Sequence, residues 1–599
     1  MQAIILAAGM GKRLMDITND QTKCMVKVNG TTLIDHCLNI ITQYPLSKIV
    51  LVIGFKGEKL KEYLGNSYNN IPIEYVNNDI YDKTNNIYSL YLAKEYLEKE
   101  DTILLESDLI FEKSVIDKLW NDPAKNVALV NKYESWMDGT VVKADDENHI
   151  VNFLSKNEFK YSDVKHYYKT VNIYKFSKEF LQDKYIPFLE AYCKSKGHNE
   201  YYEQVLKVIA FLDKKNIKVC KLEDGEKWYE IDDKQDLNNA ETIFSKGLDK
   251  YQNRYGGYWR FPQLLDFCYL VNPYFPTPKM ECEFGCYFST LLRQYPSGLN
   301  IQNILAAKMF NCSEKDILVG NGAAELISAL MTAVSDKKVG VIYPTFQEYP
   351  ARLNNNNIVK IYAREPNFSY DIEYLKKNSD SVDAFLLINP DNPSGNFIRK
   401  EEIIAFAKYL KDRNKLLILD ESFVDFAKGG EDNSLIIEEI LEEFHNLIIM
   451  KSISKSYGVP GIRLGVLVSK NTELIQETRK NLSIWNINSY GEFFLQIFGK
   501  YHEDYRLACT KIANERDRFY NELQNISYLR TIPSQANYFL CEVIGKDVNE
   551  VAEHLLEKNI LIKDCSTKEG FNNKPYIRLA VRNEEDNNQI IKELKSINK

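Results

Sequence analysis

The chain has 599 residues, of which 44% are hydrophobic and 27% charged, and its 76 basic and 84 acidic side chains give a net charge of −8. At about 100–200 residues per domain, this length predicts two to four domains. The ordinary apolar content, with 39 Tyr and 29 Phe, excludes a disordered or collagen-like chain. The acidic balance excludes a general nucleic-acid binder, because there is no basic excess to neutralise phosphates.

Targeting and cysteine signals indicate a cytoplasmic protein without a membrane segment. No apolar run approaches the roughly 18 residues that span a bilayer. The first apolar stretch, MQAIILAAG, lacks the basic segment that opens a signal peptide. The eleven cysteines are scattered, and the densest group, Cys268, Cys282 and Cys286, lacks a further ligand to complete a metal site. We therefore expect free thiols in a reducing compartment.

The first 245 residues alternate short apolar runs with helical segments. Strands are predicted at residues 3–6, 49–53, 73–76 and 102–106, and helices at residues 33–42, 58–64 and 88–97. This order favours an α/β domain with a mostly parallel sheet covered by helices. Its binding site is expected beyond the carboxyl ends of the strands.

A polar, glycine-rich stretch near residue 250 separates two halves of the chain. We place a linker at residues 246–259, between a domain of residues 1–245 and one of residues 260–599. The second half again alternates strands and helices, and its predicted strands at 338–342, 384–388 and 416–419 each end in a motif-like turn. No internal repeat is found. Both halves are therefore predicted to be α/β.

The first predicted strand runs into a glycine-containing loop with two basic residues. Gly9 and Gly11 let the backbone pass close to a ligand, with its amides facing phosphate oxygens. Lys12 and Arg13 add cationic donors. Such a turn can contain glycine for structural reasons alone, but the adjacent basic pair favours phosphate binding.

This loop and the later segment TKCMVKVNGTTLIDH resemble the nucleotidyltransferase superfamily, which includes sugar-nucleotide pyrophosphorylases, over most of residues 1–245. The resemblance implies a Rossmann-like domain in which Lys12 and Lys23 act on the phosphates or on the acceptor. Many members have Lys-Pro where this chain has Lys23-Cys24, which leaves the local turn open. The implied nucleotide-binding residues are Ala7, Ala8, Gly9, Gly11, Lys12, Arg13, Lys23, Asn86 and Ser89.

Three further segments, NNIYS, LESDL and WYEIDD, are similar to the cytidylyltransferases that activate phosphocholine. The resemblance implies that Asp108 and Asp232, with Glu230 as a possible third ligand, hold Mg²⁺ on the triphosphate of CTP. A hard dication takes oxygen ligands, and transfer at the α-phosphate needs alignment and charge neutralisation. Each acid taken singly favours a helix cap or a solvated acidic run. Together with the glycine loop and Lys23 they favour a metal site.

The acceptor pocket is implied by the segment HNEYYEQVL. Tyr201, Tyr202 and Glu203 resemble the aromatic and acidic patch that receives the cationic head of the acceptor in the phosphocholine enzymes. Aromatic faces and a carboxylate suit an ammonium group. Trp136 and Tyr229 are further candidates. For any one of these aromatic residues, ordinary core packing is the alternative.

From about residue 260 to the end, the chain resembles fold-type I aminotransferases, which have a large and a small lobe, and most closely the histidinol-phosphate aminotransferase branch. The segment KSISKSYG, continued by GIRLG, carries this resemblance. It implies that Lys455 forms the Schiff base with pyridoxal 5′-phosphate and moves the substrate proton. Ser452, Ser454 and Arg463 would hold the cofactor phosphate. A basic, serine-rich surface turn is the alternative.

Further motifs follow the family order and imply the rest of the site. Asp420 would pair with the pyridinium nitrogen, Asn392 with the phenolic oxygen, and Phe346 would stack on the ring. The backbone amides of Ala323 and Ala324 would meet the phosphate at a helix start. Arg578 would bind the α-carboxylate of the amino-acid donor. Tyr295 matches a tyrosine that reaches the cofactor phosphate of the other subunit, which implies a homodimer.

One position departs from the family. Many relatives have Asp-Glu-Ala-Tyr, with the tyrosine hydroxyl on the phenolic oxygen, whereas this chain has Asp420-Glu421-Ser422-Phe423. Phe423 cannot donate a hydrogen bond, so Asn392 would act alone. Asp-Glu-Ser-Phe also occurs in relatives that decarboxylate a phosphorylated amino acid, so decarboxylation stays open beside transamination.

The combination of the two halves narrows the range of candidate substrates. The sequence resembles fusions of a phosphonate cytidylyltransferase with a 2-aminoethylphosphonate transaminase. That implies amination of phosphonoacetaldehyde, followed by CMP transfer from CTP to give CMP-2-aminoethylphosphonate and pyrophosphate. The alternative is a phosphocholine or phosphoethanolamine cytidylyltransferase joined to an aminotransferase, or a decarboxylase, of separate purpose. A non-catalytic half is a third hypothesis, disfavoured because Asp108, Asp420, Lys455 and Arg463 are all present.

Overall fold

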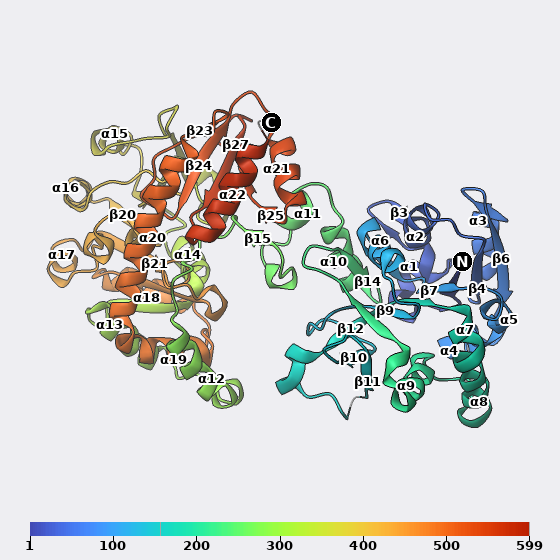
Figure 1. Cartoon of the computed structure of the whole chain (residues 1–599). Helices are drawn as coiled ribbons and strands as arrows, with labels where there is room; N and C mark the ends of the chain where they lie inside the picture. Colours follow the sequence, from blue (N-terminus) through green and yellow to red (C-terminus); the bar gives the residue numbers. More distant parts are fainter. Residues whose placement is uncertain (156, 598–599) are drawn as a thin grey trace. The chain divides into compact units, whose positions relative to one another are not determined.

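The computed structural model describes residues 1–155 and 157–597. The chain divides into two compact units, Met1–Gln263 and Leu264–Lys599 (Figure 1). Each unit has its own main sheet and its own buried core. No helix in the described ranges is long and apolar enough to cross a membrane.

One ten-stranded sheet forms the first unit. Its strands in spatial order are β11 (Ile150–Leu154), β10 (Val141–Ala144), β12 (Tyr168–Phe176), β7 (Thr102–Glu106), β1 (Gln2–Ala7), β4 (Ile49–Ile53), β6 (Ile71–Asn77) and β5 (Ser67–Tyr68), with β9 (Val127–Lys132) and β13 (Lys218–Lys221) beside β12. The four predicted strands are confirmed as the parallel set β7, β1, β4 and β6. β12 is antiparallel to β7 and β9, so the sheet is mixed rather than mostly parallel. β10 and β11 are also antiparallel, because only residues 145–149 join them and so short a connection can link only antiparallel strands.

Alternate residues of β1 pack on opposite faces of this sheet. Ala3 and Ile5 pack in the cluster that includes α2 (Leu33–Ile41), whereas Ile4 and Leu6 pack with α4 (Asn86–Leu92). Because both faces are covered, the strand is buried throughout and apolar from Ala3 to Ala7. The helix predicted over residues 88–97 is broken at Ala93 into α4 and α5 (Lys94–Leu97). The other two predicted helices are confirmed as α2 and α3 (Gly57–Leu64).

The second unit contains a seven-stranded and a four-stranded sheet. The larger runs in the order β16 (Ile317–Asn321), β22 (Leu464–Val468), β21 (Leu447–Ser452), β20 (Leu416–Asp420), β19 (Ala384–Ile388), β17 (Val339–Tyr343) and β18 (Ile358–Tyr362). The five strands from β21 to β18 are parallel, so their carboxyl ends, with the motifs that follow them, meet at one edge. The smaller sheet, β23 (Leu529–Thr531), β24 (Tyr538–Val543), β27 (Tyr576–Ala580) and β26 (Lys563–Asp564), is antiparallel. These two sheets correspond to the large and small lobes.

Residues 246–259 are folded onto the first unit. They include α11 (Asp249–Gln252), and the Arg254 guanidinium donates to Asn239 Oδ1 at 2.6 Å and to Thr242 Oγ1 at 3.0 Å on α10 (Lys234–Ile243). The division between the units therefore falls after Gln263, a few residues later than the placement of the linker.

Candidate active sites

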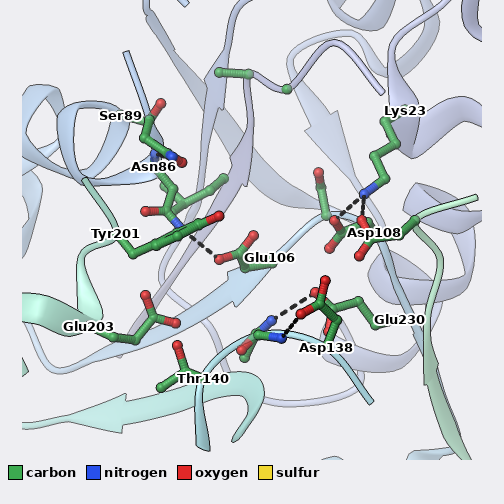
Figure 2. A pocket seen from close by; sticks show the side chains of 18 of the residues that line it. Lys23, Asn86, Ser89, Glu106, Asp108, Asp138, Thr140, Tyr201, Glu203 and Glu230 are labelled. Atoms are coloured by element: carbon green, nitrogen blue, oxygen red, sulfur yellow. Dashed lines mark hydrogen bonds and ion pairs between the residues drawn. The ribbon is translucent and has the colours of Figure 1, made fainter. Parts of the chain in front are cut away.

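In the first unit, the glycine loop lies at the carboxyl end of β1, on the wall of a cavity of about 660 Å³. Gly11 has a φ of +58°, and a Cβ there would lie 3.3 Å from the side chain of Lys23, so glycine fits both the backbone and the close approach. The cavity is lined by Ala8, Gly9, Gly11, Lys12, Arg13, Lys23, Asn86, Ser89, Asp108, Glu203, Glu230 and Asp232, among others (Figure 2). Most of the residues predicted for nucleotide and metal are thus brought together. Ala7 lies behind the wall, within the buried end of β1.

Three carboxylates form the candidate metal centre. Asp108 follows β7, and β14 (Trp228–Glu230) pairs antiparallel with β8 (Leu109–Phe111), which sets Glu230 opposite Leu109. The Ile231 amide also donates to the Asp108 carbonyl at 3.0 Å, and Asp232 follows directly. One oxygen from each of the three acids lies within 4.8 Å of the others. Oδ1 of Asp108 is buried without a hydrogen-bond partner among the described residues, so this oxygen-rich site fits a hard dication.

Basic side chains contact each of these acids. Lys23 Nζ lies 2.6 Å from Asp108 Oδ2 and 2.8 Å from Asp232 Oδ1, and Arg13 lies 2.9 Å from Asp232 Oδ2. Lys169, a buried residue of β12, lies 3.1 Å from Glu230 Oε2. Burial lowers the pKa of Lys23, but the carboxylates of Asp108 and Asp232 outweigh it and raise that pKa. For Asp232 burial raises the pKa, and Lys23 and Arg13 together hold it below its usual range.

A second acidic group lies in the same cavity (Figure 2). Glu106, the last residue of β7, accepts from Asn86 Nδ2 at 2.9 Å, and Asn86 Oδ1 accepts from the Tyr202 amide at 3.0 Å. Glu203, which begins α9 (Glu203–Leu212), is 4% exposed, and its Oε2 has no partner within the described part of the chain. Burial raises the pKa of Glu203 to about 7. Burial and the neighbouring Asp108 raise that of Glu106 well above its usual range.

Sequence reasoning missed Glu106 and Lys169. The signal for Glu106 was its place two residues before Asp108 in LESDL, where a strand end was already predicted. Lys169 carried no local signal, because only the pairing of β12 brings it to Glu230.

The aromatic prediction needs a correction at Tyr202. Its side chain is fully buried and meets Tyr174 edge-on at 5.8 Å, so it does not line the cavity. Tyr201, which is 54% exposed, lines it instead. The two residues directly precede α9, where successive side chains project in different directions. The rings of Trp136 and Tyr229 stack with their centroids 4.4 Å apart in the core beside α10. These two residues therefore show the core packing that was the alternative to a place in the acceptor pocket.

In the second unit, Lys455 lies in a buried loop after β21. Burial, with Arg578 and Arg463 nearby, lowers its pKa to about 8, which raises the fraction of the neutral amine that can attack an aldehyde. Asp420, the last residue of β20, accepts from the Tyr349 hydroxyl at 2.8 Å and from the Ser422 amide at 2.8 Å. These two partners, which the sequence did not predict, fix both carboxylate oxygens of Asp420.

The start of α14 (Gly322–Ala333), which contains the amides of Ala323 and Ala324, lies against Arg463. Gly322 has a φ of +72°, and a Cβ there would lie 2.5 Å from the guanidinium of Arg463. A Cβ at Gly465 would lie 2.5 Å from the Ala323 amide nitrogen. The buried Ser454 hydroxyl has no hydrogen-bond partner among the residues described. A guanidinium, an unpartnered hydroxyl and a helix N-terminus together fit a phosphate group.

Among the remaining predicted residues, Arg578 and Asn392 contact each other. Arg578 donates to Asn392 Oδ1 and to the Cys268 carbonyl, both at 2.9 Å. Because the Asn392 oxygen is used in this way, its amide group remains as a donor. Phe346 is partly exposed and follows the buried Thr345. Phe423 is buried edge-on against Tyr538, whose hydroxyl donates to the Asp391 carbonyl. These residues fit pyridoxal phosphate with Asn392, and not residue 423, beside its phenolic oxygen.

Two family models match the chain, one in each unit. Residues 2–246 match the Nucleotidyl transferase model, and residues 299–594 match the Aminotransferase class I and II model. The chain is therefore an enzyme with an N-terminal nucleotidyltransferase domain and a C-terminal fold-type I aminotransferase domain.

Individual relatives cover one or both of these domains. A CMP-5′-(3-aminopropyl)phosphonate synthase from Streptomyces rubellomurinus is 29% identical over 99% of this chain and 94% of its own. An L-serine phosphate decarboxylase from Campylobacter jejuni is 32% identical over 60% of this chain and 94% of its own. The structure of the histidinol-phosphate aminotransferase from Clostridium acetobutylicum is 26% identical, covers 56% of this chain and 99% of that one, and has a TM-score of 0.50.

Proposed function

We propose that the chain is a bifunctional enzyme of phosphonate biosynthesis. Its second unit aminates phosphonoacetaldehyde to 2-aminoethylphosphonate, and its first unit transfers CMP from CTP to that phosphonate, with Mg²⁺. The relative from Streptomyces rubellomurinus, whose name joins CMP to an aminoalkyl phosphonate, aligns with both units and supports this pairing.

The observation that carries the proposal is the pair of acidic groups in the first cavity. Asp108, Glu230 and Asp232 suit the metal of a metal–triphosphate complex, and Glu106 and Glu203 suit a cation on the acceptor. A primary ammonium group has three N–H donors for these carboxylate oxygens, including the unpartnered Oε2 of Glu203. A trimethylammonium group has none, which favours an aminoalkyl phosphonate over phosphocholine.

The residues of this cavity then have distinct tasks. Lys12, Arg13 and the amides of the glycine loop bind the triphosphate, and Lys23 neutralises charge near the α-phosphate. An oxygen of the phosphonate forms the new bond to the α-phosphorus, the bond to the β-phosphate breaks, and pyrophosphate leaves. No covalent protein nucleophile is needed, because alignment and charge neutralisation carry such transfers.

In the second unit, bound pyridoxal phosphate supplies an electron sink for the carbon that bears the amine. Lys455 binds the cofactor and moves the substrate proton, and Asp420 holds a positive charge at the ring nitrogen. Arg578 binds the carboxylate of the amino-acid donor bidentately. Decarboxylation of a phosphorylated amino acid is the second candidate reaction. It is favoured by the buried Phe423 and by the relative from Campylobacter jejuni.

A panel of acceptors tests the proposal. With CTP and Mg²⁺, pyrophosphate release should be fastest with 2-aminoethylphosphonate, and phosphocholine should be slower by about tenfold or more, because its head group leaves buried carboxylates unpaired. Release would be followed by a coupled phosphate assay. Faster reaction with phosphocholine would refute the assignment of the acceptor.

The variant Glu203→Gln is the matched control for that panel. Since the pKa of Glu203 is about 7, the carboxylate gains its charge as pH rises through 7, and the KM for the ammonium acceptor should fall over that interval. The phosphonate titrates by itself in both proteins, so the ratio of KM between variant and wild type isolates Glu203. A ratio that does not change with pH would contradict its role.

We also propose that two copies pair through the second unit. Large apolar side chains are exposed on α12 (Pro278–Arg293), on α13 (Leu299–Phe310) and in two loops, namely Tyr287, Phe288, Leu292, Tyr295, Ile301, Ile304, Ile484 and Trp485. Tyr295 is 78% exposed and stacks on Trp485 at 4.6 Å, which leaves its hydroxyl available to a second copy. An apolar surface of this kind favours an interface.

Replacement of Leu292 by Glu should convert the dimer to a monomer, because it places a charge in the apolar surface. Sedimentation velocity would measure the change. Leu507→Glu, at another exposed apolar residue, on α20 (His502–Leu523), should leave the dimer intact. A wild-type protein that sediments as a monomer would contradict the proposal.

A further inference from the structure

The Lys23 ammonium group occupies the position where a divalent cation would meet Asp108 and Asp232. Its nitrogen lies 2.6 Å from an oxygen of the first acid and 2.8 Å from an oxygen of the second (Figure 2). Both acids belong to the group of three whose oxygens lie within 4.8 Å of one another. A metal ion and this ammonium group therefore compete for the same carboxylate oxygens.

The charges of the site are already matched without an ion. Asp232 also contacts Arg13, and Glu230 contacts Lys169, so three carboxylates meet three basic side chains. A free dication entering this cluster would meet the ammonium charge a few ångströms away and would leave it unpaired in a largely buried place. Both effects oppose binding of the ion alone.

A nucleoside triphosphate changes this balance, because it brings negative charge and new acceptors together. Lys23 lines the same cavity as the glycine loop, so its ammonium group can turn from the acids to phosphate oxygens. That movement releases Oδ2 of Asp108 and Oδ1 of Asp232. Oδ1 of Asp108, which has no partner in the described ranges, is free throughout.

We propose that this three-carboxylate site takes its divalent cation as a metal–nucleoside triphosphate complex and excludes the free ion, with Lys23 as the exchangeable cation. The inference rests on the proposed nucleotidyl transfer, and it adds that the metal ion enters the site together with the nucleotide and not before it. Metal and nucleotide must then bind cooperatively, and each raises the affinity for the other by the same factor.

Binding of Mn²⁺ to the full-length protein without nucleotide, measured by electron paramagnetic resonance, tests the proposal. Wild type should bind Mn²⁺ weakly, and Lys23→Met should bind it at least about tenfold more tightly, because the competing charge is gone. The factor by which Mn²⁺ raises the affinity for CTP, measured by calorimetry, should be smaller in Lys23→Met than in wild type. A merely structural lysine would not make metal binding tighter when removed.

Two variants serve as controls. Lys23→Arg keeps the charge and should keep Mn²⁺ binding weak. Lys12→Met removes a charge from the same cavity, at a residue without an ion pair to these acids among the residues described, and should change the Mn²⁺ affinity by less than about threefold. Tight Mn²⁺ binding to wild type, or no gain in Lys23→Met over Lys12→Met, would overturn the proposal.

A third variant separates this inference from the proposed function. In the Lys23→Met background, Asp108→Ala should abolish the gained Mn²⁺ binding, which assigns the ion to this site. If wild type releases pyrophosphate from CTP but already binds free Mn²⁺ tightly, the exchange is wrong and the function stands. If no nucleoside triphosphate supports release, the proposed function itself fails.

Discussion

The variant Lys455→Ala should lose the visible absorption band of bound pyridoxal phosphate and should lose amino transfer by a factor of about 10²–10⁴ or more. In the proposed function this side chain both holds the cofactor aldehyde and moves the substrate proton, so its removal takes away both tasks at once. Absorption spectra and single-turnover amino transfer would measure the two losses. CMP transfer in the first unit should persist, because that cavity contains none of these residues.

The pH dependence of cofactor capture provides a second measurement on wild type. Since the neutral amine attacks the aldehyde and the pKa of Lys455 is about 8, capture by cofactor-free protein should accelerate as pH rises through 8. Lys480→Ala, at an exposed lysine paired with Glu477, should behave as wild type. A visible band that survives in Lys455→Ala would refute the assignment.

The variant Asp108→Ala should reduce CTP-dependent pyrophosphate release by about 10²–10⁴-fold, because a metal ion stabilises charge at the transferred phosphate by several kcal/mol. Two observations support Asp108 as a metal ligand. Its carboxylate lies in the candidate metal centre with Glu230 and Asp232, and one of its buried oxygens is unpartnered within the described part of the chain. Steady-state release with saturating 2-aminoethylphosphonate would measure the loss.

This variant should keep the visible band of the second unit, which distinguishes a local loss from unfolding. Asp20→Ala, at an exposed aspartate paired with Lys59, is the matched control and should release pyrophosphate normally. Retention of more than about a tenth of the wild-type rate in Asp108→Ala would contradict the metal assignment.

Local patterns predicted several of the strands and loops that carry the sites, but not β12, β14 or β21. The runs at β1, β4 and β7 are apolar because both faces of the sheet are covered, and that periodicity is visible in the sequence. Gly11 and Gly322 mark turns with positive φ, where a side chain would be strained. The acid at the end of β20 follows a strand that was also predicted, whereas β21, which precedes the lysine loop at 455, was not among the predicted strands.

Other features depended on neighbours distant in the sequence. Tyr201 and Tyr202 carry the same local signal, and only the packing of Tyr202 against Tyr174 decides which one faces the cavity. The break at Ala93 and the antiparallel pairing of β12 with β7 were missed for the same reason, since tertiary packing and long-range pairing override local propensity.

The α/β class of both halves could be predicted from the sequence alone, because short-range periodicity is a local property. Side-chain type indicated which residues could bind phosphate, a metal ion or a cofactor. Tertiary structure decided which of them act together. Pairing of β14 with β8 sets Glu230 beside Asp108 across more than a hundred residues, and β12 adds Lys169. Burial then shifted the pKa values of these side chains. Long-range contacts and removal from water have no local signature, so the exchange at Lys23 and the titration of Glu203 follow only from the fold.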